Sequence, residues 1–310
     1  MKLLNMTMDD WRSPLVLALI VLLAAQLTLA LGLRLTAPKV TAFAPTMPLL
    51  PFDSAAVTRI RLDGGATAVT LQRDAANGWV IAELGDFPVA PAKVTQLLAT
   101  LAGLKRTLPV ATSAAALARF KLTADGYERR VILEDKHGAV ATLLLGEALG
   151  FRRLVARPAA DAAVYEVKLA LSEMSNRRED WFDSTLLQVP LEQLARIESA
   201  EWTLVKDGAG WRFADAATPV NQEKVKSLVM RLANLTYRNV LAAADAPTDP
   251  AQPPRQFTLT LADGSQRSYR VFHLRDSADY VLQDGERPWR FQLAQDDVGE
   301  LLATMKLTND

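Results

Sequence analysis

The sequence predicts an α+β protein: one N-terminal transmembrane helix followed by two tandem related modules. Each module is expected to be a mostly antiparallel sheet with one main amphipathic helix and a short closing helix. Three observations predict this. An uncharged apolar run stands near the N-terminus, the phrase "PVAPAKVTQLLATLAGL" returns as "PVNQEKVKSLVMRLANL", and short strand patterns surround both copies. The 310 residues suit two cores of ordinary domain size.

The apolar run, Leu15 to Leu33, reads "LVLALIVLLAAQLTLALGL" and contains no charged residue. As a helix it is about 28 Å long, close to the thickness of a bilayer core. Trp11 and Arg12 precede the run and Arg34 follows it, which is typical of membrane interfaces. A cleavable signal peptide is the alternative, but an apolar run beyond about 15 residues favours a retained anchor.

We therefore expect a short cytoplasmic tail at residues 1–13, a transmembrane anchor at residues 14–34 and a stalk at residues 35–54. The stalk contains four prolines, which oppose regular structure. A short tail before a long body is typical of a signal-anchor. The expected location is the bacterial inner membrane, with a single pass and the body in the periplasm.

Small residues recur every four positions within the anchor. Ala24, Thr28 and Gly32 share one helix face, where small side chains let another helix approach closely. Gln26 could add an interhelical hydrogen bond of about 1 kcal/mol. These four residues are a possible helix contact in the membrane, although Ala-rich and Leu-rich spans often show such spacing without a partner.

The repeated phrase belongs to a longer repeat. Ile60 and Ile197 are 137 residues apart, and Val167 and Phe291 are 124 apart, with intermediate separations for the segments between them. A separation that only falls is expected if one structural unit is duplicated and the second copy has shorter loops. We expect the first module at residues 55–185 and the second at residues 186–310.

Each module is predicted to begin with short strands around a glycine turn, Asn77–Gly78 in the first and Asp207–Gly208 in the second. A hairpin follows later, turning at His137–Gly138 and at Asp263–Gly264. The segment "LALSEMSNRRED" is predicted to be a short closing helix of the first module.

The repeated phrase itself predicts an amphipathic helix that covers each sheet, because its apolar residues form a single stripe. Pro91 suits a first helical position and Asn221 suits a helix cap. The two stripes are Val94, Leu97, Leu98, Leu101 and Leu104, and Val225, Leu228, Val229, Leu232 and Leu235.

Composition excludes several classes of function. Lys plus Arg equals Asp plus Glu, at 35 each, so no basic surface for nucleic acid is indicated. The absence of cysteine excludes disulfides, thiolate catalysis and sulfur-ligated zinc. The two histidines, His137 and His273, are too few for a histidine-rich metal site. No phosphate loop, dinucleotide fingerprint or hydrolase motif is present.

The order of these segments resembles a bacterial domain-of-unknown-function family, number 4340. The resemblance is carried by "PAKVTQLLATLAGL", "VILEDKHGAVATLLLGE", "VYEV" and "NRREDWFDSTLL" in that order, from Val57 to about Leu302. It implies membrane or lipid anchoring, a body outside the cytoplasm, and partners among auxiliary components of gliding-motility-type ABC transporters. It implies no catalytic residue.

The cluster "RREDWFD" lies where the first module joins the second. Its carboxylates, Glu179, Asp180 and Asp183, could act as acid and base in a hydrolase. Opposite charges at such close spacing pair with each other, however, so we interpret the cluster as a seam between the modules. The expected seam residues are Arg178, Asp180, Trp181 and Phe182.

Other conspicuous residues have structural interpretations. Trp79 and Trp211 are expected in equivalent module cores rather than as sugar-stacking platforms. Asp296 and Asp297 suit the positive end of a helix. We expect no catalytic, cofactor or metal site, and a non-enzymatic, membrane-anchored protein-interaction or scaffold module. A periplasmic glycan- or lipid-binding module is the alternative.

Overall fold

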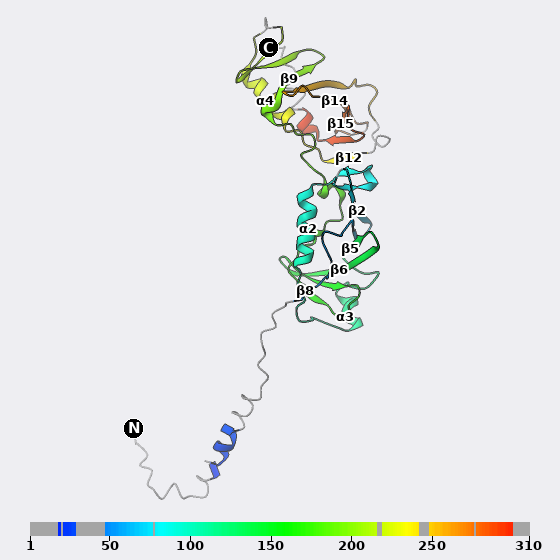
Figure 1. Cartoon of the computed structure of the whole chain (residues 1–310), viewed down its shortest axis with the longest axis vertical. Coiled ribbons are helices and arrows are strands. Elements are labelled where there is room, and N and C mark those ends of the chain that lie inside the picture. Colours follow the sequence, from blue (N-terminus) through cyan, green and yellow to red (C-terminus); the bar gives the residue numbers. More distant parts are fainter. Residues whose placement is uncertain are drawn as a thin grey trace, which may run out of the picture. The chain divides into compact units, whose positions relative to one another are not determined.

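The computed structural model describes residues 18–19, 21–28, 47–76, 78–215, 219–241, 248–275 and 277–299. The chain divides into two units, Met1–Pro45 and Thr46–Asp310. The second unit contains two eight-stranded sheets, one after the other along the chain (Figure 1). This confirms the predicted α+β class with mostly antiparallel sheets and few helices.

The first sheet has the order β4-β3-β2-β1-β5-β6-β7-β8, and every neighbouring pair is antiparallel. Strands next to each other in the sheet are therefore mostly joined by hairpins. Its strands are β1 (Arg59–Gly64), β2 (Thr67–Asp74), β3 (Gly78–Ile81), β4 (Phe87–Pro88), β5 (Arg129–Asp135), β6 (Gly138–Gly150), β7 (Arg153–Pro158) and β8 (Tyr165–Val167).

The second sheet has the order β11-β10-β9-β13-β14-β15-β16-β12. Seven of its strands repeat the order of β3-β2-β1-β5-β6-β7-β8. The eighth strand differs, because β4 extends the first sheet beside β3 whereas β12 extends the second beside β16. The strands are β9 (Leu194–Ser199), β10 (Thr203–Asp207), β11 (Gly210–Phe213), β12 (Asn239–Leu241), β13 (Arg255–Leu261), β14 (Gln266–His273), β15 (Tyr280–Asp284) and β16 (Arg290–Leu293).

The aligned residues Ile60 and Ile197 hold the same place in the two sheets. Each is fully buried and has a leucine opposite it on both neighbouring strands. The two halves are thus tandem sheet modules of related topology. The flanking leucines are Leu71 and Leu133 around Ile60, and Leu204 and Leu259 around Ile197.

The two repeated phrases form the helices α2 (Pro91–Gly103) and α4 (Gln222–Ala233), each with its predicted stripe buried. Pro91 is the first residue of α2, and the Asn221 side chain accepts a hydrogen bond from the Lys224 N–H at 3.1 Å. Other short helices of the body are α3 (Ala114–Arg119), the helical residues 295–299, and the 3₁₀ turns η2 (Ala82–Leu84), η3 (Leu171–Met174), η4 (Arg178–Trp181) and η5 (Leu191–Gln193).

Two local predictions need correction. The hairpin predicted to turn at His137–Gly138 turns one residue earlier, because the His137 N–H donates to the Asp135 carboxylate at 2.7 Å and Asp135 pairs with Gly138. The closing segment of the first module is two 3₁₀ turns, η3 and η4, rather than one helix. Ser175 between them is extended, which lets Asn176 bond elsewhere.

One continuous cluster of buried apolar side chains runs through both modules. It includes the stripes of α2 and α4 and the inward faces of both sheets. It also includes Leu49 and Leu50, so residues 47–54, predicted as part of the stalk, belong to the body. The Leu49 N–H donates to the Leu104 carbonyl at 2.8 Å, just beyond the end of α2.

Little of the predicted anchor falls within the described residues. Residues 18–19 and 21–28 are helical; the tail at residues 1–13, residues 35–46 of the stalk, Gly32 and Asn77 lie outside the described part. Over the described residues, no helix is both long enough and apolar enough to cross a membrane.

Leu228→Ala should lower the free energy of unfolding by about 2–5 kcal/mol, because Leu228 is fully buried between α4 and its sheet. Met230→Ala is the matched control on the same helix. Met230 is 48% exposed, so its loss should change stability by less than about 0.5 kcal/mol. Urea unfolding of the full chain in detergent measures both; equal effects would contradict the assigned helix face.

Candidate functional site

The strongest concentration of aromatic side chains lies where the first sheet meets the second. Phe87 on β4 is fully buried at its centre. Its ring centroid is 4.9 Å from Phe182, 5.0 Å from Trp289, 6.1 Å from Tyr237 and 6.2 Å from Phe291, and the planes are edge-on. Such edge-to-face geometry is the favoured one for aromatic pairs. We call these five residues the aromatic seam.

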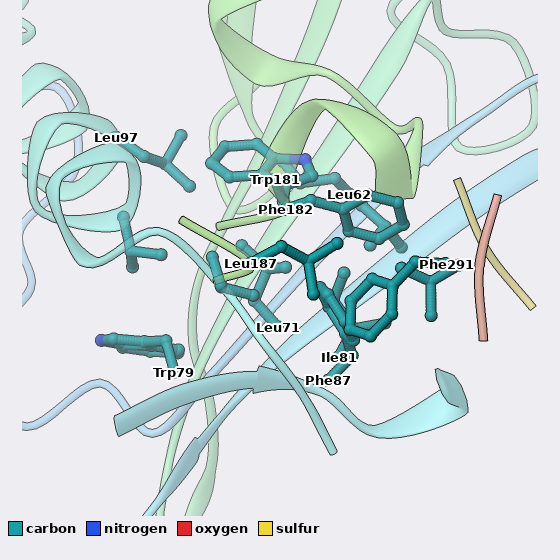
Figure 2. Packing of buried hydrophobic residues seen from close by; sticks show 14 of the residues in the cluster. Leu62, Leu71, Trp79, Ile81, Phe87, Leu97, Trp181, Phe182, Leu187 and Phe291 are labelled. Atoms are coloured by element: carbon teal, nitrogen blue, oxygen red, sulfur yellow. The ribbon is translucent and has the colours of Figure 1, made fainter. Parts of the chain in front are cut away.

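Both modules contribute to the aromatic seam. Phe87 and Phe182 come from the first module and the segment that follows it, whereas Tyr237, Trp289 and Phe291 surround the β12–β16 edge of the second sheet. Figure 2 shows Phe291 beside the cluster that contains Phe87, Phe182 and Trp181. The two sheets are therefore joined by a shared core rather than by a bare linker.

Hydrogen bonds fix the seam in one arrangement. The Trp289 indole N–H is shared between the carbonyls of Leu84 and Gly85, at 2.9 and 3.1 Å. The Tyr237 hydroxyl donates to the Asp183 carbonyl. Burial raises the pKa of Tyr237 above its ordinary value, so it stays a neutral donor. Each of these bonds joins a side chain of the second module to backbone before it in the chain.

The predicted seam residues divide into two groups. Trp181 and Phe182 are both 4% exposed, and the Trp181 indole N–H donates to the Ser175 carbonyl at 2.9 Å. The Ala90 N–H, at the start of α2, donates to the Trp181 carbonyl. The two charged residues lie at the surface: Arg178 pairs with Glu179 at 3.3 Å, and Asp180 accepts from the Ser175 hydroxyl at 2.5 Å.

Sequence reasoning missed most of the aromatic seam. Phe87, Tyr237 and Trp289 stand in short irregular stretches, "GDFPV", "LTYRN" and "RPWRF", outside any apolar periodicity. One signal was available in the sequence. A large aromatic side chain beside a turn or a proline is unfavourable if it stays exposed to water, so it is expected to pack against another part of the chain. Such a signal does not say which aromatic residues meet.

The closing segment of the first module also docks on the β1–β2 hairpin through polar groups. Asn176 is 8% exposed, and its amide donates to the Gly64 carbonyl at 2.6 Å and to the Thr67 carbonyl at 3.1 Å. Beside this point the Asp63 carboxylate accepts from Arg61 at 2.7 Å and from Arg130 at 2.7 Å. Asn176 thus holds the closing segment against the hairpin, and Asp63 ties β1 to β5.

Burial by itself would raise the pKa of the Asp63 carboxyl, but the hydrogen bonds from Arg61 and Arg130 outweigh it. The net effect is a pKa below the ordinary value. The ionised carboxylate is therefore the form that the folded chain favours. Its contribution to stability is present above the unfolded-state pKa and is lost as pH falls through the folded-state pKa.

The histidines, the paired tryptophans and the acidic pair are not brought together. His137 is exposed in a turn, and His273 lies edge-on to Tyr280 with centroids 5.0 Å apart. Trp79 is buried, whereas Trp211 is half-buried. Asp296 and Asp297 are exposed within the helix at residues 295–299. The described residues contain no group of three or more His, Cys, Asp and Glu placed to hold a metal ion.

In the predicted membrane segment, the Thr28 hydroxyl donates to the carbonyls of Ala24 and Ala25, both at 2.9 Å. The hydroxyl is thus engaged within its own helix. Ala24 and Gln26 lie on that helix within the described residues. The contact predicted for the face with Gly32 remains a prediction.

The family model described as "Domain of unknown function (DUF4340)" matches residues 79–254, more than half of the chain. The chain belongs to the DUF4340 family. The match begins on β3 of the first sheet and ends just before β13 of the second, so the DUF4340 unit runs across the junction of the two sheets. No curated protein and no solved structure matches the chain.

The truncation Phe87→Ala should lower the free energy of unfolding by about 3–5 kcal/mol, because it empties the centre of the aromatic seam. Phe151→Ala is the control, since Phe151 is 92% exposed and its loss should be nearly neutral. Urea unfolding followed by tryptophan fluorescence measures the effect. Trp181→Ala, next to the aromatic seam, should also lower the unfolding midpoint. Unchanged midpoints for both Phe87→Ala and Trp181→Ala would refute the shared core.

Asp63→Asn should destabilise the chain by about 1–3 kcal/mol at pH 7, because an amide replaces a buried acceptor of two arginine bonds. The difference from the parent should shrink as pH falls through the depressed pKa of Asp63, because the parent carboxyl then becomes neutral too. Unfolding midpoints measured from pH 7 down to the lowest pH at which the chain still folds test this. Glu83→Gln, at an exposed site, is the control; a difference that persists at low pH would contradict the ion-pair account.

Proposed function

We propose that this DUF4340 protein is a membrane-anchored, extracytoplasmic scaffold that binds other proteins and catalyses no reaction. Its expected setting is a membrane complex, such as an ABC transporter with auxiliary components. The observation that carries the proposal is the aromatic seam around Phe87. It joins two duplicated sheets into one body that can present widely separated surfaces in a fixed relation.

The hydrogen bonds and ion pairs of the candidate catalytic carboxylates, Glu179, Asp180 and Asp183, support the absence of catalysis. The Asp183 carboxylate accepts from the Thr185 N–H and hydroxyl, at 3.0 and 2.6 Å. Asp180 is held by Ser175, and Glu179 pairs with the neighbouring arginines. Each carboxylate ties down its own loop, and a hydrolase would need two of them facing one substrate bond.

The apolar run at Leu15–Leu33 and the short connection to the body motivate the anchor. A single-cysteine assay tests the side of the membrane, since the chain has no cysteine of its own. With the outer membrane permeabilised, His137→Cys should react with a membrane-impermeant maleimide in otherwise intact cells. Asn5→Cys, in the predicted tail, should react only after lysis; the reverse pattern would overturn the orientation.

Chemical cross-linking in cells at native abundance, followed by mild detergent extraction, tests the scaffold role. We expect the chain to be recovered with integral membrane proteins, including transporter components. Recovery of the chain alone, with cross-linking controls that work, would contradict the proposal.

A second candidate function is a binding module for a glycan or lipid fragment. A hollow of about 350 Å³ at the β9–β10 turn favours it, lined among others by Ser199, Glu201, Trp202 and Phe213. The Trp202 side chain is only 6% exposed, which gives little ring face for stacking on a sugar. Glycan fragments at about 100 times their dissociation constant would stabilise the chain by about 2.7 kcal/mol if they bind.

A further inference from the structure

We propose that the β8 side of the first module lies against the lipid bilayer through a patch of exposed apolar side chains. The patch comprises Met47, Leu108, Val110, Leu149 and Phe151, and we call it the β8 surface. The inference rests on the proposed function, because it requires that the chain is anchored in a membrane. The inference adds to the proposed function by assigning the end of the body that touches lipid.

The β8 surface gathers several of the most exposed large apolar side chains of the body. Met47 is 65% exposed, Leu108 67% and Phe151 92%, and Val110 and Leu149 are 46% and 41% exposed. Phe151 stands in the two-residue loop between β6 and β7, so its ring projects from a hairpin tip. A bulky aromatic side chain at a loop tip is suited to the boundary between headgroups and acyl chains.

The segments that carry these side chains flank one strand. Glu166 on β8 links them: its carbonyl accepts from the Thr107 hydroxyl at 3.4 Å, and its carboxylate pairs with Arg153 at 2.6 Å. Leu108 follows Thr107 directly, and Phe151 is two residues before Arg153. Arg106, which precedes Thr107, donates its N–H to the Met47 carbonyl at 3.0 Å, so Met47 lies beside the same segment.

This surface lies at the end of the first module that faces away from the second sheet. β4, which carries Phe87 of the aromatic seam, and β8 are opposite edges of the first sheet. The two ends of α2 point the same way. Lys93 in its first turn donates to the carbonyls of Asp180 and Phe182, near the aromatic seam. The Leu104 carbonyl, just beyond its last turn, accepts from the Leu49 N–H. In Figure 1 the labels β8 and α3 mark this end of the sheet.

The position of Met47 along the chain argues for lipid as the occupant. Residues 34–46 alone connect the apolar run Leu15–Leu33 to Met47, and even fully extended they span at most about 45 Å. The part of the body that the connection reaches first is the β8 surface. A body held this close meets the bilayer at a high effective concentration, so a weak apolar contact suffices.

Charge around the patch is compatible with a lipid headgroup layer. Lys105, Arg152, Arg153 and Lys168 are exposed around it. Glu166 and Glu173 pair with the two arginines, and Glu147 is exposed near Leu149, which leaves a small positive excess among these residues. Basic side chains around interfacial apolar residues favour anionic lipid surfaces.

Site-specific fluorescence on the full chain tests the proposal. Leu149→Cys creates a single thiol for a bimane label, and Val140→Cys is the matched control. Both side chains are 41% exposed and both lie on β6, toward its opposite ends, about 30 Å apart. The chain is reconstituted in nanodiscs of phosphatidylethanolamine and phosphatidylglycerol, with or without a nitroxide quencher on the lipid. Circular dichroism checks that both variants fold.

We expect the label at position 149 to lose about half of its emission to the lipid quencher, because interfacial side chains sit about 5–10 Å into the boundary. The label at position 140 should be unaffected. If neither label is quenched although the chain co-migrates with nanodiscs, the lipid contact is overturned and the anchored scaffold stands. Failure to co-migrate overturns both. Shielding at position 149 that needs no lipid and rises with protein concentration would assign the surface to a second copy, which also overturns the proposal.

Discussion

The structure of the body depends on covering one sheet edge. β4 is a two-residue strand at the edge of the first sheet, and an uncovered edge with apolar side chains invites unwanted pairing. Phe87 on that strand is fully buried because Tyr237, Trp289 and Phe291 of the second module enclose it. The Trp289 indole then closes the contact by bonding the backbone of η2 and the turn after it. The second module is thus the cap of the first, and the two cores become one cluster.

The repeat shows how the β12–β16 edge of the second module differs from the β8 edge of the first. The separations that align Phe291 with Val167 and the two main helices also align Trp289 with Tyr165 and Tyr237 with Arg106. In the first module the Arg106 guanidinium lies 5.4 Å from the Tyr165 ring centroid and pairs with Asp161 at 3.0 Å. Where the second module presents aromatic rings to a neighbour, the first presents an ion pair over a ring. Arg106 covers the Tyr165 ring there, and the large apolar side chains that stay exposed at this end of the first module are those of the β8 surface.

Local patterns were sufficient to predict the two main helices and the order of the hairpins, because these depend on residues close together in the sequence. The stripe of α2 and α4, the Pro91 start and the Asn221 cap follow from periods of 3.6 residues and from the chemistry of helix ends. The falling separation between repeats predicted the tandem sheets. The aromatic seam could not be predicted in this way, because Phe87 and Trp289 are brought together only by the packing of two sheets. The prediction of one closing helix was wrong for a similar reason. Asn176 bonds Gly64 and Thr67, more than a hundred residues earlier, and that contact prevents a continuous helix.

The buried polar groups of the first module serve the same end as its aromatic residues. Asp63 ties β1 to β5 through Arg130, and Asn176 holds the closing segment against the β1–β2 hairpin. That segment then carries Trp181 and Phe182 to the start of α2. From there Phe182 meets Phe87 and Tyr237. A chain of contacts therefore connects the first hairpin to the second module. The DUF4340 match, residues 79–254, contains α2, the closing segment and α4 but begins after β1 and β2. The matched residues therefore run across the junction between the two sheets and include parts of both.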